Sequence, residues 1–304
     1  MAKVFFTDDD DPIDIRYDNV FKAVFTRPSS TSRGALSRLV SAFIGRDVFI
    51  ESIAANEPPI DNLRDRQIRF DINCRSASGE MVNVEMSLNP APYEPIRIEY
   101  YAGMLFTGQD IKGTEYDYDS LKQAYQITIL AKGYFFRDEE FYHTFEFYDP
   151  INHVSLDGKS RIITIELSKL DKIVEKPADT MTSRENWAVF LGYLTDKGKR
   201  NKINEIVKNE EGVAMASEVL QIIGKDWEER CRLVSELKYE LDLQSYKAYA
   251  RKQGLKEGRE EGREEGEASK ALAIAKKMVE AGYSLETVVS MTSLEPEKVQ
   301  ELFN

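Results

Sequence analysis

Two strand-like runs joined by a short turn constrain the fold of this chain more than any other feature. Residues 68–74 and 82–88 each alternate apolar and polar side chains with a period of two, the pattern of a strand with one apolar face. The connecting residues 76–80 contain Gly79, which can adopt the positive φ that a tight turn requires. The sequence therefore predicts a β-hairpin.

The register of this hairpin places two acidic residues opposite each other. If the turn is centred on Ser78, Asp71 pairs with Glu85, and their Cβ atoms come within ~5 Å. Two carboxylates at that distance repel each other, and a divalent cation held by oxygen ligands offsets the repulsion. The alternative is a polar, solvated sheet face with an ordinary acidic pair. The pattern alone leaves both interpretations open.

Composition limits the classes of protein that are compatible with the chain. Its 304 residues, 42% of them hydrophobic, suffice for one large domain or two smaller ones. The net charge of −12 argues against nonspecific coating of nucleic acid, although an enzyme could still reach DNA through a narrow cleft. Cys74 and Cys231 predict no disulfide framework, and Cys74 is expected in the core.

The sequence predicts a cytoplasmic protein without a membrane partner. The N-terminus is acidic, and no stretch approaches 18 consecutive apolar residues. Since His143 and His153 are the only histidines, a His-rich zinc site is excluded. Phosphate-binding P-loops, nucleophile elbows and dinucleotide-binding glycine motifs are also absent from the sequence. Any chemistry is therefore expected from carboxylates, lysines and a metal ion.

The order of expected elements indicates a mixed α/β fold. Before residue 179, helices are expected over 18–25, 35–44 and 97–108, and further strands over 48–54, 124–131, 142–148 and 161–167. The largely apolar run 124–131 is typical of a central strand. After residue 179, helices are expected over 187–194, 202–208, 213–223 and 228–243. We expect three regions: an α/β domain over 1–178, a helical region over 179–245 and a charged, glycine-punctuated helical tail with small terminal helices over 246–304.

The tail contains a charged run, 251–270, in which glycines recur every fourth residue. The run holds six basic and six acidic residues, so it is neutral overall. Because each glycine costs a helix ~1 kcal/mol relative to alanine, we do not expect a stable lone helix here. A solvated, partly helical linker and an oligomerisation stem are the two alternatives. Beyond it, residues 269–303 are expected to form helix, turn, helix, turn, helix, with Gly282 and Ser293 in the turns. The outline is that of a helix-turn-helix, but its last helix is too acidic for the major groove of DNA, so we interpret it as a small docking or dimerising tail.

An Asp, a hairpin and a Glu preceded by a helix resemble the plan of a PD-(D/E)XK nuclease. Further motifs resemble the Rpn family of recombination-promoting nucleases and putative transposases. These motifs are Asp18-x-x-Phe21-Lys22-x-x-Phe25, Phe70-Asp71-Ile72, Val84-Glu85-Met86, Arg97-x-x-x-Tyr101-x-x-x-Leu105-x-x-x-Gln109, Tyr125-Gln126-Ile127, Ile165-Glu166-Leu167-Ser168-Lys169 and the glycine-punctuated tail. They cover most of residues 14–170. The resemblance implies a restriction-endonuclease-like mixed sheet flanked by helices, followed by a helical C-terminal extension.

The resemblance also implies a function: metal-dependent cleavage of DNA in recombination or mobile-element activity. Asp71 and Glu85 would be ligands of Mg²⁺, or of Mn²⁺, and Asp18 could join them. Such an ion polarises the phosphodiester and lowers the pKa of a bound water. The alternatives are a catalytically degenerate relative that binds nucleic acid or protein, and a purely structural oligomer assembled through the tail.

One position departs from the family pattern. Ser87 stands where the superfamily has Lys and the Rpn family usually has Gln, and a serine offers only a hydrogen bond. Either activity is weak or lost, or a basic residue from elsewhere substitutes, with Lys22 and Arg97 as candidates. Lys22 is preferred as a catalytic residue because the motif puts it on the same helix as Asp18. The alternative for Lys22 is a solvated helix lysine.

Two further groups of side chains compete for a place at the site. Thr164, Glu166 and Ser168 are expected on one strand face, followed by Lys169, but no hairpin Asp precedes them. The second group, expected as a basic rim for phosphate together with Lys22, consists of Arg64, Arg66 and Arg69.

Overall fold

The computed structural model describes residues 5–7, 9–54, 70–109, 117–133 and 135–303. The chain divides into two compact units, residues 1–237 and 238–304. Among the described helices, none combines the length and apolar character needed to cross a lipid bilayer.

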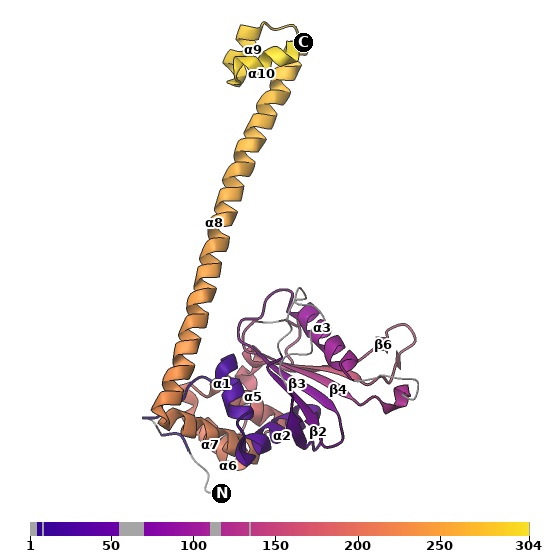
Figure 1. Cartoon of the computed structure of the whole chain (residues 1–304), viewed down its shortest axis with the longest axis vertical. Helices are drawn as coiled ribbons and strands as arrows, with labels where there is room; N and C mark the ends of the chain where they lie inside the picture. The colour runs from indigo at the N-terminus through magenta and orange to yellow at the C-terminus, as the bar shows by residue number, and fades with distance from the viewer. Residues whose placement is uncertain (1–4, 8, 55–69, 110–116, 134, 304) are drawn as a thin grey trace. The chain divides into compact units, whose positions relative to one another are not determined.

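Six of the described strands form one mixed sheet in the order β1-β2-β3-β4-β8-β5 (Figure 1). The strands are β1 (Ile50–Ile53), β2 (Ile72–Ser76), β3 (Met81–Ser87), β4 (Ala124–Leu130), β5 (Tyr142–Phe145) and β8 (Ser160–Glu166). Strands β3, β4 and β8 are parallel, and the other pairs are antiparallel. A separate hairpin joins β6 (Tyr148–Asp149) to β7 (Val154–Ser155). The predicted mixed α/β sheet is confirmed, with β4 inside it.

Helices lie on both faces of this sheet, α3 on one face and α1, α2 and α5 on the other (Figure 1). The described α-helices that lie wholly within the first unit are α1 (Asp18–Phe25), α2 (Ser30–Ile44), α3 (Glu94–Thr107), α4 (Asp171–Val174), α5 (Ser183–Tyr193), α6 (Arg200–Asn209) and α7 (Glu211–Lys225). The 3₁₀ turn η1 (Tyr118–Ser120) lies between α3 and β4, η2 (Leu167–Lys169) between β8 and α4, and η3 (Lys197–Lys199) between α5 and α6. Local sequence sets the helix ends: the Ser29 side chain caps the start of α2, and Gly45 (φ 86°) ends it.

The two faces of the sheet differ in polarity because side chains alternate along each strand. On one face, Ile72, Val84, Ile127 and Ile163 join a core with α1, α2 and α5. The opposite face, towards α3, is polar and buried; its side chains include Asn83, Glu85, Gln126, Thr128, Thr164 and Glu166. The interpretation of this face as polar and solvated is therefore wrong: the face is polar, but it lies beneath protein.

The helices after residue 179 share the core of the sheet. Trp187 on α5 is fully buried, and its ring lies 6.0 Å from that of Phe25 on α1. Gly212 allows α7 to approach α2 and α5 closely. A Cβ at this position would lie 2.4 Å from Arg38 Cβ on α2 and 2.9 Å from Trp187 Cζ2 on α5. The sheet and residues 179–225 therefore form one packed body.

We expect Gly212→Ala to destabilise this body by about 1–3 kcal/mol, because the added methyl group must displace packed atoms. Gly258→Ala is the matched control, since a Cβ there meets nothing within 4 Å. It is expected to stabilise its helix by up to ~1 kcal/mol. Urea unfolding, monitored by circular dichroism, measures both changes. If Gly212→Ala leaves the free energy of unfolding unchanged, the contact of Gly212 with Arg38 and Trp187 does not limit the size of this side chain.

The charged, glycine-punctuated run is helical, so the expectation that it would not form a stable helix was wrong. Helix α8 (Trp227–Glu280) runs without interruption through residues 251–270. Ion pairs one turn apart stabilise it, as between Arg263 and both Glu260 and Glu267. Strong helix formers (Ala, Leu, Glu, Lys, Arg) fill much of the sequence between the glycines. These contributions offset part of the cost of the glycines.

The last residues fold as the sequence predicted. Gly282 (φ 83°) follows α8, and Ser293 (φ 56°) separates α9 (Leu285–Thr292) from α10 (Pro296–Gln300), which leads into η4 (Glu301–Phe303). A small core of Ala275, Val288 and Val299 holds these helices together. The second unit therefore has a hydrophobic core of its own.

Candidate active site

The hairpin formed by β2 and β3 has the predicted register. Ile72 pairs with Val84, and the turn contains Gly79 at φ 86°. One residue further, Asp71 and Glu85 are tied together through their backbones. The Asp71 N–H donates to Glu85 Oε1 at 3.0 Å, and the Met86 N–H donates to Asp71 Oδ2 at 2.9 Å. Backbone donors therefore fix one oxygen of each carboxylate.

Both carboxylates are buried, with Asp71 8% and Glu85 4% exposed. Burial, the Glu85 charge and the Asp18 charge raise the pKa of Asp71 well above its ordinary value, and Lys22 opposes them. Burial also raises the pKa of Glu85, against the hydrogen bonds that it accepts from Asn83 and Asp71. The positive charge nearby therefore does not offset the burial of the two carboxylates, and an added cation would stabilise their charged forms.

Lys22 and Asp18 on α1 lie beside this pair. Lys22 Nζ is 2.8 Å from Asp18 Oδ2 and 3.2 Å from Asp71 Oδ1. Burial disfavours the charged lysine, but Asp71 and Asp18 outweigh this effect and raise its pKa. Lys22 is therefore an ion-pair partner at the site rather than a merely solvated lysine.

Arg97, the other basic candidate, lies at the Ser87 end of the site. Its Nη2 is 3.5 Å from Ser87 Oγ, and its guanidinium pairs with the buried Glu94. The guanidinium carbon also lies 5.5 Å from the centre of the Tyr101 ring. The structure thus brings Lys22 to Asp71 and Arg97 to Ser87, the position where the superfamily has Lys.

Sequence reasoning did not identify the hydrogen-bonded amides that hold Glu85. Asn83 Nδ2 donates to Glu85 Oε1 at 3.0 Å and to Gln126 Oε1 at 2.9 Å. Gln126 Nε2 donates in turn to Thr128 Oγ1 at 3.1 Å. The alternation of β3 carried a signal for Asn83, because residues 83 and 85 share a face. The pairing with Gln126 depends on the parallel β3–β4 register.

Two residues of α3 were also missed as members of the site. Glu94 anchors Arg97, and its i,i+3 spacing from that arginine was the available signal. Burial and the charge of Glu85 raise the pKa of Tyr101, whose ring lies 5.5 Å from the Arg97 guanidinium carbon. Tyr101 belonged to a motif of the sequence but had no role assigned to it.

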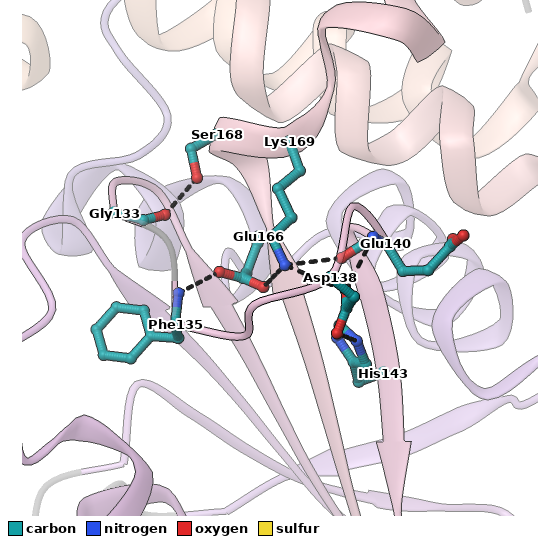
Figure 2. Close-up of polar contacts among 8 residues, drawn as sticks. All are labelled: Gly133, Phe135, Asp138, Glu140, His143, Glu166, Ser168 and Lys169. Atoms are coloured by element: carbon teal, nitrogen blue, oxygen red, sulfur yellow. Dashed lines mark hydrogen bonds and ion pairs between the residues drawn. The ribbon is translucent and has the colours of Figure 1, made fainter.

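The competing acidic motif forms a different cluster (Figure 2). Glu166 ends β8, and its Oε2 lies 2.5 Å from Lys169 Nζ, while its Oε1 accepts from the Phe135 N–H at 2.6 Å. Lys169 Nζ also donates to the Glu140 carbonyl at 3.1 Å. In the sheet register, Leu130 stands between Glu166 and Ser87. This cluster ties the segment after β4 to the end of β8.

Ser168 does not lie on the strand face that was expected to hold it. It belongs to η2, and its hydroxyl donates to the Gly133 carbonyl. The expected face therefore ends at Glu166, because the chain leaves the sheet there. Thr164 does share the face of Glu85, two strands away, across Thr128. The expected basic rim of Arg64, Arg66 and Arg69 lies outside the described residues.

The side chains present suit a divalent ion bound by two carboxylates. Within the described part of the chain, no three Asp, Glu, His or Cys residues form a group that could hold a metal ion. Magnesium, however, is commonly bound by one or two protein carboxylates, with water and substrate phosphate completing its shell. Asp18 Oδ1 is buried and accepts no hydrogen bond from the described residues. This unpaired oxygen and the raised pKa of Asp71 both indicate that an added cation would stabilise the site.

A mixed sheet with flanking helices and a hairpin that joins Asp71 to Glu85 define a PD-(D/E)XK nuclease-like fold. A family model described as "PD-(D/E)XK nuclease family transposase" matches residues 15–250. The chain belongs to this family, which supports a nuclease- or transposase-related role. PD-(D/E)XK nucleases generally use divalent metal ions. No curated protein and no solved structure matches the chain.

The raised pKa of Asp71 has a consequence for stability. Between about pH 4 and its folded pKa, Asp71 keeps a proton that the unfolded chain has lost, so stability falls as pH rises through this window. Asp71→Asn removes this titration and is expected to make stability less dependent on pH across the window in the metal-free protein. Urea unfolding in EDTA at several pH values measures the difference. Parallel pH profiles for wild type and variant would contradict the expectation.

Proposed function

We propose that this protein is a DNA endonuclease that depends on Mg²⁺ or Mn²⁺ and acts in recombination or mobile-element activity. The observation that carries the proposal is the buried Asp71–Glu85 pair, in which one oxygen of each carboxylate accepts a backbone hydrogen bond. Family membership supports the same reaction class. Two further expectations stay predictions: a cytoplasmic location, and self-association through the C-terminal tail (246–304), where Tyr246, Tyr249 and Leu255 are exposed.

Each residue of the site has a role in this proposal. Asp71 and Glu85 hold the divalent ion, with Asp18 as a further ligand, and the bound ion supplies Lewis-acid activation of water and phosphodiester. Asn83 keeps Glu85 oriented through its hydrogen bond. Lys22 supplies the positive charge for the phosphate that Ser87 lacks.

Ser87 favours a second candidate function, that of a catalytically degenerate relative that binds nucleic acid or protein. Its hydroxyl contacts Arg97, and a hydroxyl cannot replace the charge of a lysine. The proximity of Lys22 to Asp71 favours the enzyme, because a cation is present beside the carboxylate pair.

Nicking of supercoiled plasmid separates the two candidates. The full chain is expected to nick DNA in Mg²⁺ or Mn²⁺ and to stop when EDTA is added. Binding of DNA in a gel-shift assay, without any metal-dependent nicking, would favour the degenerate relative. Nicking that persists in EDTA would contradict a metal-dependent mechanism.

A further inference from the structure

Lys22 lies between two of the carboxylates proposed to bind metal. Its Nζ is 2.8 Å from Asp18 Oδ2 and 3.2 Å from Asp71 Oδ1. The ammonium thus joins α1 to the residue that precedes β2. These are distances of charge-assisted hydrogen bonds or close ion pairs.

The other Asp71 oxygen is already held by the backbone. Oδ2 accepts the Met86 N–H, which leaves Oδ1, the oxygen that Lys22 contacts. A cation that binds Asp71 through Oδ1 must therefore approach the Lys22 ammonium. Two positive charges repel strongly at such short range in a partly buried site. Lys22 in its present position and a divalent ion on Asp71 Oδ1 oppose each other.

We propose that Lys22 is a place-holder for the metal ion, one that pairs with Asp18 and Asp71 until a divalent ion displaces it. This inference rests on the proposed function of the site. The lysine side chain is 26% exposed and has a flexible four-carbon stem, so its ammonium can leave without moving α1. Once displaced, the ammonium remains beside the site, where it can contact a phosphate.

Arg97 does not share this property. Its guanidinium contacts Ser87 and Glu94, neither of which belongs to the proposed metal ligands. Its geometry suits a residue that positions phosphate without competing with the ion for Asp71. The place-holder role is therefore specific to Lys22 among the two basic candidates.

Calorimetric titration of the full chain with Mn²⁺ alone, in the absence of DNA, tests the inference. Lys22→Met and Lys22→Gln are expected to bind Mn²⁺ on the order of tenfold more tightly than wild type, because no ammonium has to be displaced. Both variants are expected to nick DNA more slowly at saturating metal. The matched control is Lys199→Met, which removes a similarly exposed lysine paired with Glu175 and should leave Mn²⁺ affinity unchanged.

Mn²⁺ affinity that stays equal to wild type, or weakens, in both folded Lys22 variants would overturn the place-holder role. Weakening in both would instead assign Lys22 the structural role of holding Asp71 in place. If wild type binds Mn²⁺ no better than Asp71→Asn, the proposed function fails and this inference fails with it. Binding by wild type that Asp71→Asn abolishes, without a gain in the Lys22 variants, rejects the inference alone.

Discussion

Glu85→Gln is expected to lower metal-dependent nicking by about 10³-fold or more, because it removes one of two carboxylates proposed to hold the ion that activates water. The amide oxygen of Gln can still accept the hydrogen bonds that Asn83 and the Asp71 N–H donate to Glu85. The fold is therefore expected to survive, and the loss reports on charge rather than on structure. Asp71→Asn is expected to have an effect of the same size.

Plasmid nicking across a range of Mg²⁺ and Mn²⁺ concentrations measures this loss. Glu139→Gln, which neutralises an exposed carboxylate paired with Lys172, is the matched control and should retain wild-type activity. Circular dichroism and urea unfolding verify that the variants fold. If Glu85→Gln and Asp71→Asn nick as fast as wild type, the hairpin is not the catalytic centre.

Lys169→Met is expected to destabilise the protein by about 3–5 kcal/mol, the largest stability effect that the structure predicts. It removes the partner of Glu166, whose side chain is fully buried, and leaves that carboxylate with the Phe135 N–H as the partner that remains among the described residues (Figure 2). The double variant Glu166→Gln/Lys169→Met is expected to recover most of the loss, since no uncompensated charge remains. Urea unfolding of wild type, both single variants and the double variant measures the coupling.

The exposed ion pair of Lys172, three residues after Lys169, with Glu139 controls for the loss of a lysine. Lys172 and Glu139 are 82% and 84% exposed, so Lys172→Met should leave stability close to that of wild type, because water screens an exposed pair. Equal effects at positions 169 and 172 would mean that burial adds nothing to the Glu166–Lys169 pair. A double variant as unstable as Lys169→Met would show that the lost contacts, rather than the unpaired charge, set the cost.

Local patterns in the sequence were sufficient to predict the hairpin and most of the elements around it. Period-two alternation identified β2 and β3, and the turn with Gly79 fixed their register, so Asp71 and Glu85 were placed opposite each other. The helix that carries Asp18 and Lys22 was predicted from the helical spacing of its apolar residues. These features depend on residues close in sequence, which is why they could be derived without a structure.

Burial and contacts between distant segments were decided only by the tertiary structure. Alternation showed that the face of Glu85 is polar, but only its position towards α3 shows that this face is buried, which raises the carboxylate pKa values. The contacts of Asn83 with Gln126 and of Lys22 with Asp71 join residues more than 40 positions apart. Likewise, the alternation and composition of residues 161–167 placed Glu166 on a strand. Its pairing with the buried Lys169 depends on the turn of the chain into η2. The sequence determined which residues alternate along a strand and which pair across the hairpin. Tertiary packing determined which charged side chains are buried and which of them form ion pairs.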